Sequence, residues 1–158
     1  MFYAGFKTLV SIFFNLLNLL MGGNLPPFTC VCVVIEDQGR YLIVRRPKGD
    51  LVLPGGFMRW RERPEQTARR ECKEETGLDI QPGEFVSYTS LVSNRLDRMS
   101  TCNIILQGKV LGGNLRNSIE GSPCWLSADE LQSAQLSHFS RDAFDRYLRY
   151  RTKREGQS

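Results

Sequence analysis

The chain has 158 residues and a mass of 18.1 kDa, which is enough for one domain with a short appendage and too little for a typical two-domain enzyme. Hydrophobic residues make up 41% and charged residues 24%, so the composition excludes a disordered or collagen-like chain. The formal net charge of +4 suits a protein that handles anionic small molecules, and it is too small to indicate a dedicated nucleic-acid binder.

The chain holds five cysteines and one histidine, His138. The cysteines are odd in number, form no C-x-x-C pair and fall mostly in apolar runs, which favours small buried side chains over a disulfide framework. A single histidine gives little support for a zinc site. We therefore expect a reducing, cytoplasmic environment. The cysteines are Cys30, Cys32, Cys72, Cys102 and Cys124.

The first 27 residues differ from the rest of the chain. Residues 9–21 are an uncharged, mostly apolar run, shorter than the roughly 20 residues that cross a bilayer. The spacing predicts an amphipathic helix over about residues 5–21, ended by Gly22-Gly23-Asn24 and followed by a linker up to Pro27. The polar residues of this helix share one arc of about 100°, opposite a broad apolar face. They are Lys7, Thr8, Ser11, Asn15 and Asn18.

This helix has three interpretations. A secretory signal peptide is the weakest, because the amino end carries only Lys7 and no A-x-A-like site follows. Peripheral contact with a membrane usually requires more basic residues on the polar face. The third interpretation is packing on the body of the same chain or on a partner copy in a homodimer. The pattern leaves the last two open.

The globular body is predicted to span residues 28–150, followed by a basic polar tail over residues 151–158. Strands are expected at residues 29–35, 40–45, 51–53, 85–91, 102–110 and 124–126. Helices are expected from Pro64 to Thr76, where Gly77 ends the helix, and at residues 130–134 and 141–151. A break at Pro54-Gly55-Gly56 leads into a loop.

Three carboxylates of the first of these helices are spaced to share a face. Glu71, Glu74 and Glu75 are related by i, i+3 and i+4, which places them within about 100° of arc. Like charges at this spacing destabilise a helix, and coordination of a divalent cation by oxygen ligands is a common reason for such a cluster. The alternative is a solvated charged face in which Arg70 forms an ion pair with Glu74, and the glutamates alone do not decide between the two.

A longer pattern surrounds these glutamates. From Gly56 to Leu78, the chain matches G-x5-E-x7-R-E-U-x-E-E-x-G-U at all seven fixed identities across 23 positions, with Cys72 where U is usually aliphatic. This segment resembles the Nudix box, and the chain is similar to Nudix hydrolases. The resemblance implies an α/β/α sandwich around a mixed β-sheet over about residues 28–150. It also implies hydrolysis of a diphosphate bond, either in a nucleoside diphosphate linked to another moiety or in a nucleoside triphosphate, with Mg²⁺ as cofactor and Mn²⁺ as a substitute.

The resemblance also assigns site residues. It implies that Glu71, Glu74 and Glu75 bind metal and activate water, that Gly56 adds a backbone carbonyl, and that Arg70 orients a glutamate. The stretch that begins at Glu120 resembles an E-G-x-P motif of some members that cleave nucleoside triphosphates, which makes Glu120 a further metal-binding candidate. Either Glu71 or Glu120 would act as the general base.

The substrate is expected to be a nucleotide-type small molecule. Arg45, Arg46 and Arg59 are candidates for clamping its phosphates, although each of them also suits a solvated surface. Phe57, Trp60, Tyr88 and Trp125 are candidates for stacking on a base. The alternatives to an enzyme are a catalytically silent Nudix-like binding module and a membrane-associated adaptor.

Overall fold

A computed structural model describes the backbone of residues 2–156 and the side chains of residues 8–156. The chain divides into two compact units. We refer to Met1–Thr29 with Ser90–Cys102 as the N-terminal unit, and to Cys30–Thr89 with Asn103–Ser158 as the sheet unit. Each unit is described by itself.

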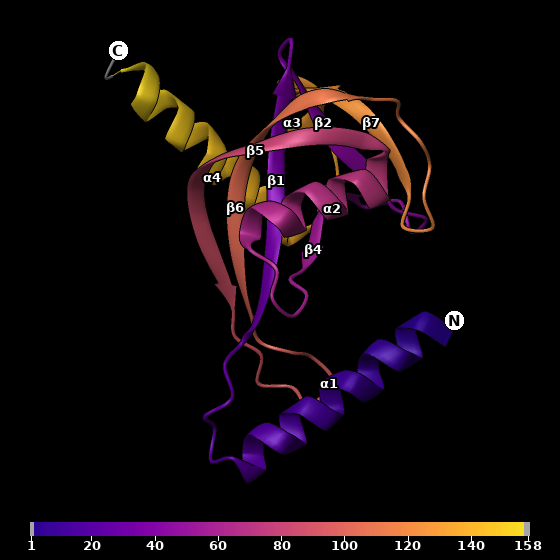
Figure 1. The fold of residues 1–158 in the computed structure, drawn as a ribbon, viewed down its shortest axis with the longest axis vertical. Helices are drawn as coiled ribbons and strands as arrows, with labels where there is room; N and C mark the ends of the chain where they lie inside the picture. The colour runs from indigo at the N-terminus through magenta and orange to yellow at the C-terminus, as the bar shows by residue number, and fades with distance from the viewer. Residues whose placement is uncertain (1, 157–158) are drawn as a thin grey trace. The chain divides into compact units, whose positions relative to one another are not determined.

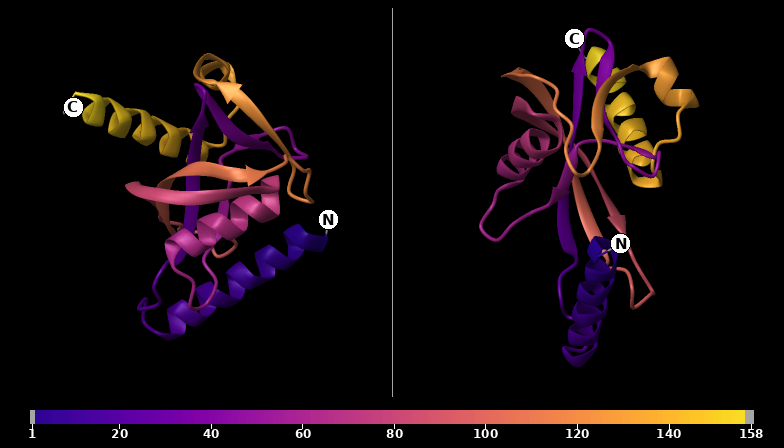
Figure 2. Two further views of the ribbon diagram at one scale, coloured as in Figure 1. Left: turned by 45° about the horizontal axis from the view of Figure 1, so that its top comes forward. Right: turned by 90° about the vertical axis from the view of Figure 1, so that its right-hand side faces the viewer.

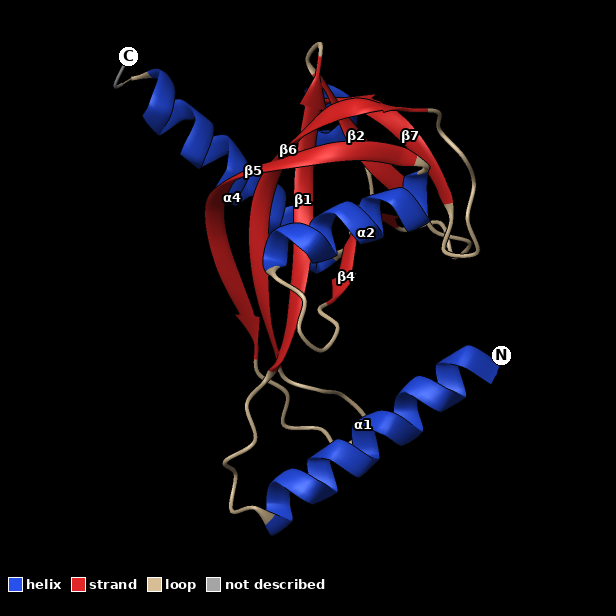
Figure 3. Cartoon of the chain, viewed as in Figure 1, coloured by secondary structure: helices blue, strands red, loops and turns tan. Residues whose placement is uncertain are grey.

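The strands form a seven-stranded sheet in the described part of the chain (Figures 1 and 3). They run in the order β3-β2-β1-β6-β5, while β4 pairs with β1 and β7 pairs with β2. Apolar and β-branched runs form the central strands, as the sequence predicts. The strands are β1 (Phe28–Asp37), β2 (Arg40–Arg45), β3 (Leu51–Val52), β4 (Gly55–Phe57), β5 (Leu78–Leu91), β6 (Thr101–Gly113) and β7 (Ser122–Ser127).

Helices flank both faces of this sheet, which confirms the predicted α/β sandwich with a mixed sheet (Figure 2). α2 (Pro64–Thr76) lies on one face, and α3 (Ala128–Ser133) and α4 (His138–Glu155) lie on the other. α2 starts with proline, whose fixed φ suits the first turn of a helix. It ends at Gly77 with φ of 82°, where a Cβ would lie 2.5 Å from the Asn114 carbonyl oxygen.

The core consists of two apolar clusters, one on each side of β1. Val31, Val33 and Ile35 pack towards α2 with Ala68 and Cys72. Cys32 and Val34, which alternate with these residues along β1, point to the other face and pack on α3 and α4 with side chains of β2 and β3. This second cluster also contains Tyr41, Leu131, Phe144 and Tyr147. Because successive side chains of a strand point to opposite faces, a strand covered by helices on both sides is apolar throughout. This explains the uninterrupted run of buried residues in β1.

The largest differences from the sequence prediction concern three elements. β5 begins at Leu78, directly after α2, because Leu78 and Ile80 are buried and alternate with exposed residues; Pro82 is accommodated since β5 is at the sheet edge. β4 forms where a loop was expected, through antiparallel pairing with β1. α4 begins at His138 and runs to Glu155, longer than predicted, because the Ser137 hydroxyl accepts the N–H of Ser140 and caps the helix.

In the N-terminal unit, the predicted helix is confirmed as α1 (Phe2–Leu20) (Figure 1). Lys7 was predicted on the polar arc of this helix, but its side chain is outside the described residues. The side-chain amide of Asn15 donates to backbone carbonyls of the 90–102 segment, and Asn18 Oδ1 accepts the N–H of Leu25. None of the helices in the described residues is long and apolar enough to cross a membrane.

Candidate active site

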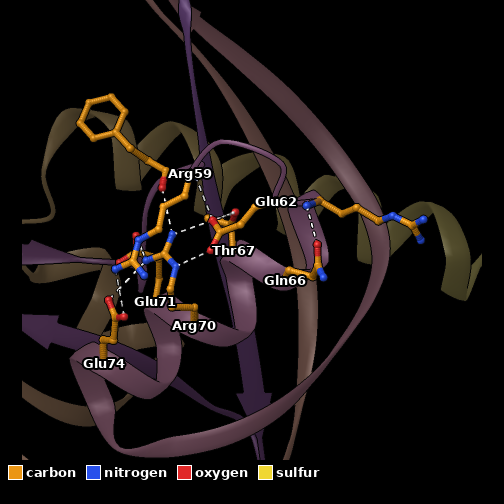
Figure 4. A network of polar contacts seen from close by, with 9 residues as sticks. Arg59, Glu62, Gln66, Thr67, Arg70, Glu71 and Glu74 are labelled. Carbon is orange, nitrogen blue, oxygen red and sulfur yellow. Dashed lines mark hydrogen bonds and ion pairs between the residues drawn. The ribbon is translucent and has the colours of Figure 1, made fainter.

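Arg70, in the middle of α2, is at the centre of a polar network that joins this helix to the loop before it (Figure 4). Its Nε and Nη2 donate to the two carboxylate oxygens of Glu62 at 2.7 and 2.8 Å, and Nη2 also donates to the Phe57 carbonyl at 3.0 Å. The Thr67 hydroxyl donates to the same carboxylate at 2.7 Å. The guanidinium of Arg70 holds the pKa of Glu62 well below its usual range, so this carboxylate is ionised at neutral pH. The loop between β4 and α2 is therefore tied to the helix by a bidentate, charge-assisted pair.

The remaining nitrogen of Arg70 reaches two of the predicted metal-binding carboxylates. Nη1 donates to Glu71 Oε1 at 2.6 Å and lies 3.3 Å from Glu74 Oε2. Arg59 approaches Glu74 from the other side, with Nη2 3.2 Å from Oε1. Arg70 thus contacts the glutamate that it was expected to orient. Arg59, expected near phosphate, is paired with Glu74 in this structure.

Glu75 lies beneath this network and is almost fully buried, with 4% of its surface exposed. Its Oε2 accepts the backbone N–H of Gly55 at 3.1 Å, and its carboxyl shares a hydrogen bond with Glu120. Burial, with a smaller contribution from the neighbouring charges of Glu120 and Glu71, raises the pKa of Glu75 to about 8, against the lowering effect of the Gly55 N–H. A hydrogen bond between two carboxyl groups requires a shared proton, so this pair is poised to exchange a proton for a cation.

The loop between β6 and β7 brings Glu120 to the helix. Besides its contact with Glu75, its charge acts on Glu71, whose pKa is raised by burial in spite of the hydrogen bond from Arg70. Glu120 is itself exposed. The structure therefore gathers Glu71, Glu75 and Glu120 from two segments that are far apart in the sequence, with Glu74 at the rim.

Gly56 packs directly against this group. A Cβ at this position would lie 2.5 Å from Glu71 Oε1, so only glycine leaves room for the carboxylate as it stands. The adjacent Gly55 is constrained differently: its φ is 152°, and a Cβ there would lie 2.2 Å from the Val31 carbonyl oxygen.

These two glycines give a matched test. We expect Gly56→Ala to lower kcat at least about tenfold with a stability loss under about 1.5 kcal/mol, because the Glu71 side chain can move away. Gly55→Ala should instead destabilise the fold by more than about 2 kcal/mol, because the Cβ meets backbone atoms that cannot move freely. Steady-state kinetics and urea unfolding of both variants check this. A Gly56→Ala enzyme with unchanged kcat would contradict the contact with Glu71.

The residues present fit a hard divalent cation. The donors are carboxylate oxygens, together with the carbonyl of Gly56, which packs directly against Glu71, and such oxygen sets suit Mg²⁺ or Mn²⁺. Within the described residues, no three Asp, Glu, His or Cys side chains are already grouped as a metal site. One oxygen of Glu71 is held by Arg70, and Glu75 and Glu120 bond to each other. Small side-chain rotations of Glu71 and Glu120 would therefore be needed to surround an ion.

Two arginines predicted near phosphate lie elsewhere. Arg45 shares its face of β2 with Ile43, which packs towards α3 and α4, so it lies on the sheet face opposite α2. Its side chain contacts Cys124 and lines a shallow depression beside α3. Arg46 pairs with Asp50 at 3.6 Å. The structure does not bring either residue together with the glutamates.

Sequence reasoning missed the role of Glu62. The residue is a fixed position of the box pattern, but no local rule shows that it binds Arg70, eight residues further along the chain. The only signal was its place in the pattern. It also missed the pairing of Arg59 with Glu74, which depends on how the loop folds back over α2.

Comparison with known proteins identifies the family. The profile of the NUDIX domain matches residues 26–147. A MutT-like protein of Streptomyces ambofaciens is 33% identical over 111 residues, 67% of this chain and 69% of that protein. An ADP-ribose pyrophosphatase of Methanocaldococcus jannaschii is 30% identical over 125 residues, 77% of this chain and 69% of that protein. The chain therefore belongs to the Nudix family and is an enzyme of the Nudix hydrolase class.

Solved structures confirm the fold. The crystal structure of an ADP-ribose pyrophosphatase from Streptococcus suis superimposes with a TM-score of 0.68 at 22% identity. The match covers 82% of this chain and 93% of that one. At this identity the likeness establishes the fold, and the substrate has to be argued from the site.

Proposed function

We propose that the protein hydrolyses the diphosphate bond of a nucleoside diphosphate linked to another moiety, with Mg²⁺ or Mn²⁺ as cofactor. The observation that carries the proposal is the convergence of Glu71, Glu75 and Glu120 on one site next to Gly56. Gathering three carboxylates around the buried Glu75 is costly unless a positive charge enters among them. The box glutamates are all present, which favours an enzyme over a catalytically silent binding module.

In this proposal Glu71, Glu75 and Glu120 hold the cation with the Gly56 carbonyl, and Glu74 at the rim adds charge. The bound cation would neutralise phosphate oxygens and lower the pKa of a coordinated water. Arg70 limits the motion of Glu71 because Glu62 holds the other edge of its guanidinium. Glu75 is fixed from below by the Gly55 N–H.

The proton of the attacking water goes to Glu71 or to Glu120. Glu71 is largely buried and bonded to Arg70, whereas Glu120 is exposed on a loop and shares a hydrogen bond with Glu75. Glu71→Gln and Glu120→Gln distinguish the two, because the true base loses the rise of kcat with pH that its ionisation produces. Each residue also contributes to holding the ion, so both variants need saturating metal.

The substrate class rests on two supports. One relative is an ADP-ribose pyrophosphatase, which acts on a nucleoside diphosphate linked to a sugar. Around the box, the Trp60 side chain is 89% exposed and can stack on a base, and Phe57 beside it is 41% exposed, whereas Trp125 packs partly against the core. The second candidate is a nucleoside triphosphate, favoured by the motif at Glu120.

A substrate panel tests the proposal. We expect the purified protein with Mg²⁺ to release AMP from ADP-ribose with a kcat/KM at least about tenfold above that for ATP, and to be inactive in EDTA. Mn²⁺ should restore activity. Glu75→Gln, purified in the same way, is the control for contaminating hydrolases.

Two results would count against parts of this proposal. Preferred release of pyrophosphate from a nucleoside triphosphate would favour the second candidate. Absence of any cleavage of nucleotide diphosphate bonds with either metal would refute the proposed activity.

A further inference from the structure

The apolar face of α1 is exposed. Four side chains at spacings of 4, 3 and 4 residues form a stripe along the helix, each between 47% and 84% exposed. They are Leu9, Phe13, Leu16 and Leu20. A helix of a water-soluble domain normally turns such a stripe towards its core.

The polar stripe of the same helix makes its contacts with the rest of the N-terminal unit. Ser11 is 5% exposed, and the Asn15 amide donates to the carbonyls of Leu96 at 2.9 Å and Arg98 at 3.0 Å. Asn18 bonds the backbone of the linker that follows the helix. The short polar side chains of α1 therefore attach the helix to the 90–102 segment, and the exposed apolar stripe lies on the other side of the helix.

The width of the apolar face indicates what covers it. On a helical wheel of 100° per residue, Leu19 and Val10 mark the two edges of the apolar face. The arc between them covers about 180° and contains no charged residue. A partner helix covers a narrower seam, and the positions beside such a seam usually carry charges. The acyl region of a bilayer surrounds half of a helix without needing a specific seam.

The 90–102 segment supplies the basic groups that α1 lacks. Arg95 and Arg98 lie at the carbonyls bound by Asn15, and Leu91, Val92 and Leu96 beside them are exposed. Asp97, the only acidic residue in the sequence of the N-terminal unit, forms an ion pair with Arg95 at 2.8 Å. The unit thus combines exposed apolar side chains with a net positive charge, which is complementary to a surface of anionic lipid headgroups.

We propose that the N-terminal unit binds the surface of anionic bilayers, with the exposed face of α1 inserted at the boundary between headgroups and acyl chains. Arg98 contacts the headgroups, and the 90–102 segment attaches the helix to the hydrolase. The proposal is independent of which nucleotide the enzyme cleaves.

Vesicle flotation of the full-length protein tests this. We expect it to float with vesicles of phosphatidylcholine and phosphatidylglycerol, and to bind vesicles of phosphatidylcholine alone at least about fivefold less. Phe13→Asn should lower binding to the mixed vesicles at least about tenfold, because it removes a large inserted side chain. Arg98→Ala should lower it about fivefold.

Matched controls come from the sheet unit. Leu111→Asn replaces another exposed apolar residue, Lys109→Ala removes another exposed positive charge, and neither should change vesicle binding. Thermal unfolding followed by circular dichroism confirms that every variant is folded, and Leu16→Asn repeats the test should Phe13→Asn fail to fold.

Three results would overturn the proposal. One is a wild-type protein that floats with neither vesicle, and another is equal binding to both vesicles that Arg98→Ala leaves unchanged. The third is a stable dimer by light scattering that Phe13→Asn dissociates, in the absence of vesicle binding. That result would identify a second copy of the chain as the occupant of the exposed face.

Discussion

Glu75→Gln is expected to inactivate the enzyme and, at the same time, to stabilise the metal-free protein at alkaline pH. The kcat should fall at least about 100-fold, because the site loses a buried negative charge that the cation requires. The neutral amide can still accept the N–H of Gly55, so the loop contact is kept. Without metal, the wild-type protein must bury an ionised carboxylate among Glu71 and Glu120, and the variant need not.

The sign of the pH dependence follows from the raised pKa. The folded state holds a proton on Glu75 up to about pH 8, whereas the unfolded chain releases it near 4.5. Between these values the folded state binds more protons, so wild-type stability falls relative to Glu75→Gln as the pH rises from 4.5 to 8. In EDTA we expect near-equal stability at pH 4, and a gain for the variant on the order of 2 kcal/mol or more at pH 8.5.

Urea unfolding in EDTA at both pH values measures this difference. Glu74→Gln is the matched control, because Glu74 lies on the same helix with its side chain half exposed. It should also lower kcat about 100-fold, but it should not stabilise the metal-free protein. Near-normal turnover of both variants would remove the glutamates from the proposed mechanism, and the absence of a stability gain for Glu75→Gln would contradict the burial of a charge at this position.

Glu62→Gln is expected to cost both stability and activity. The substitution replaces one carboxylate oxygen by an NH₂ group that faces the donors of Arg70 and Thr67, so part of a largely buried charge-assisted network is lost. We expect a loss of about 2–3 kcal/mol in the free energy of unfolding at pH 7. Because Arg70 is then less firmly held, Glu71 should be misplaced and kcat should fall at least about tenfold.

The low pKa of Glu62 determines how this effect varies with pH. The carboxylate stabilises the fold above its unfolded pKa, and the contribution decreases as the pH falls towards the lowered folded value. The difference between wild type and Glu62→Gln should therefore narrow below about pH 4. Glu65→Gln, at an exposed position in the first turn of the same helix, is the control and should change stability by less than about 0.5 kcal/mol. An equal loss in both variants would show that the Arg70 pair contributes nothing specific.

Local sequence patterns predicted much of the fold. Three features were predicted from residues within or next to the element itself. They are the apolar runs that form β1 and β2, the proline that starts α2 and the glycine that ends it, and the helical periodicity of polar and apolar residues in α1. These features depend on backbone sterics and on periodic burial. The course of β5 past Pro82 was not predicted, since a proline within a strand is tolerated only at an edge, and the edge is defined by the other strands.

The Nudix box could be identified from the sequence by itself. It predicts a helix with Glu71, Glu74 and Glu75 on one face, because residues three and four positions apart share a face when a turn has 3.6 residues. Only the tertiary structure decided that Glu120 joins Glu75, that Glu62 secures Arg70, and that Arg45 faces away. It also decided that the polar side of α1 is the attached side, through the bonds of Asn15 to the 90–102 segment. Such contacts join residues that are distant along the chain, so they depend on how the sheet, loops and helices pack.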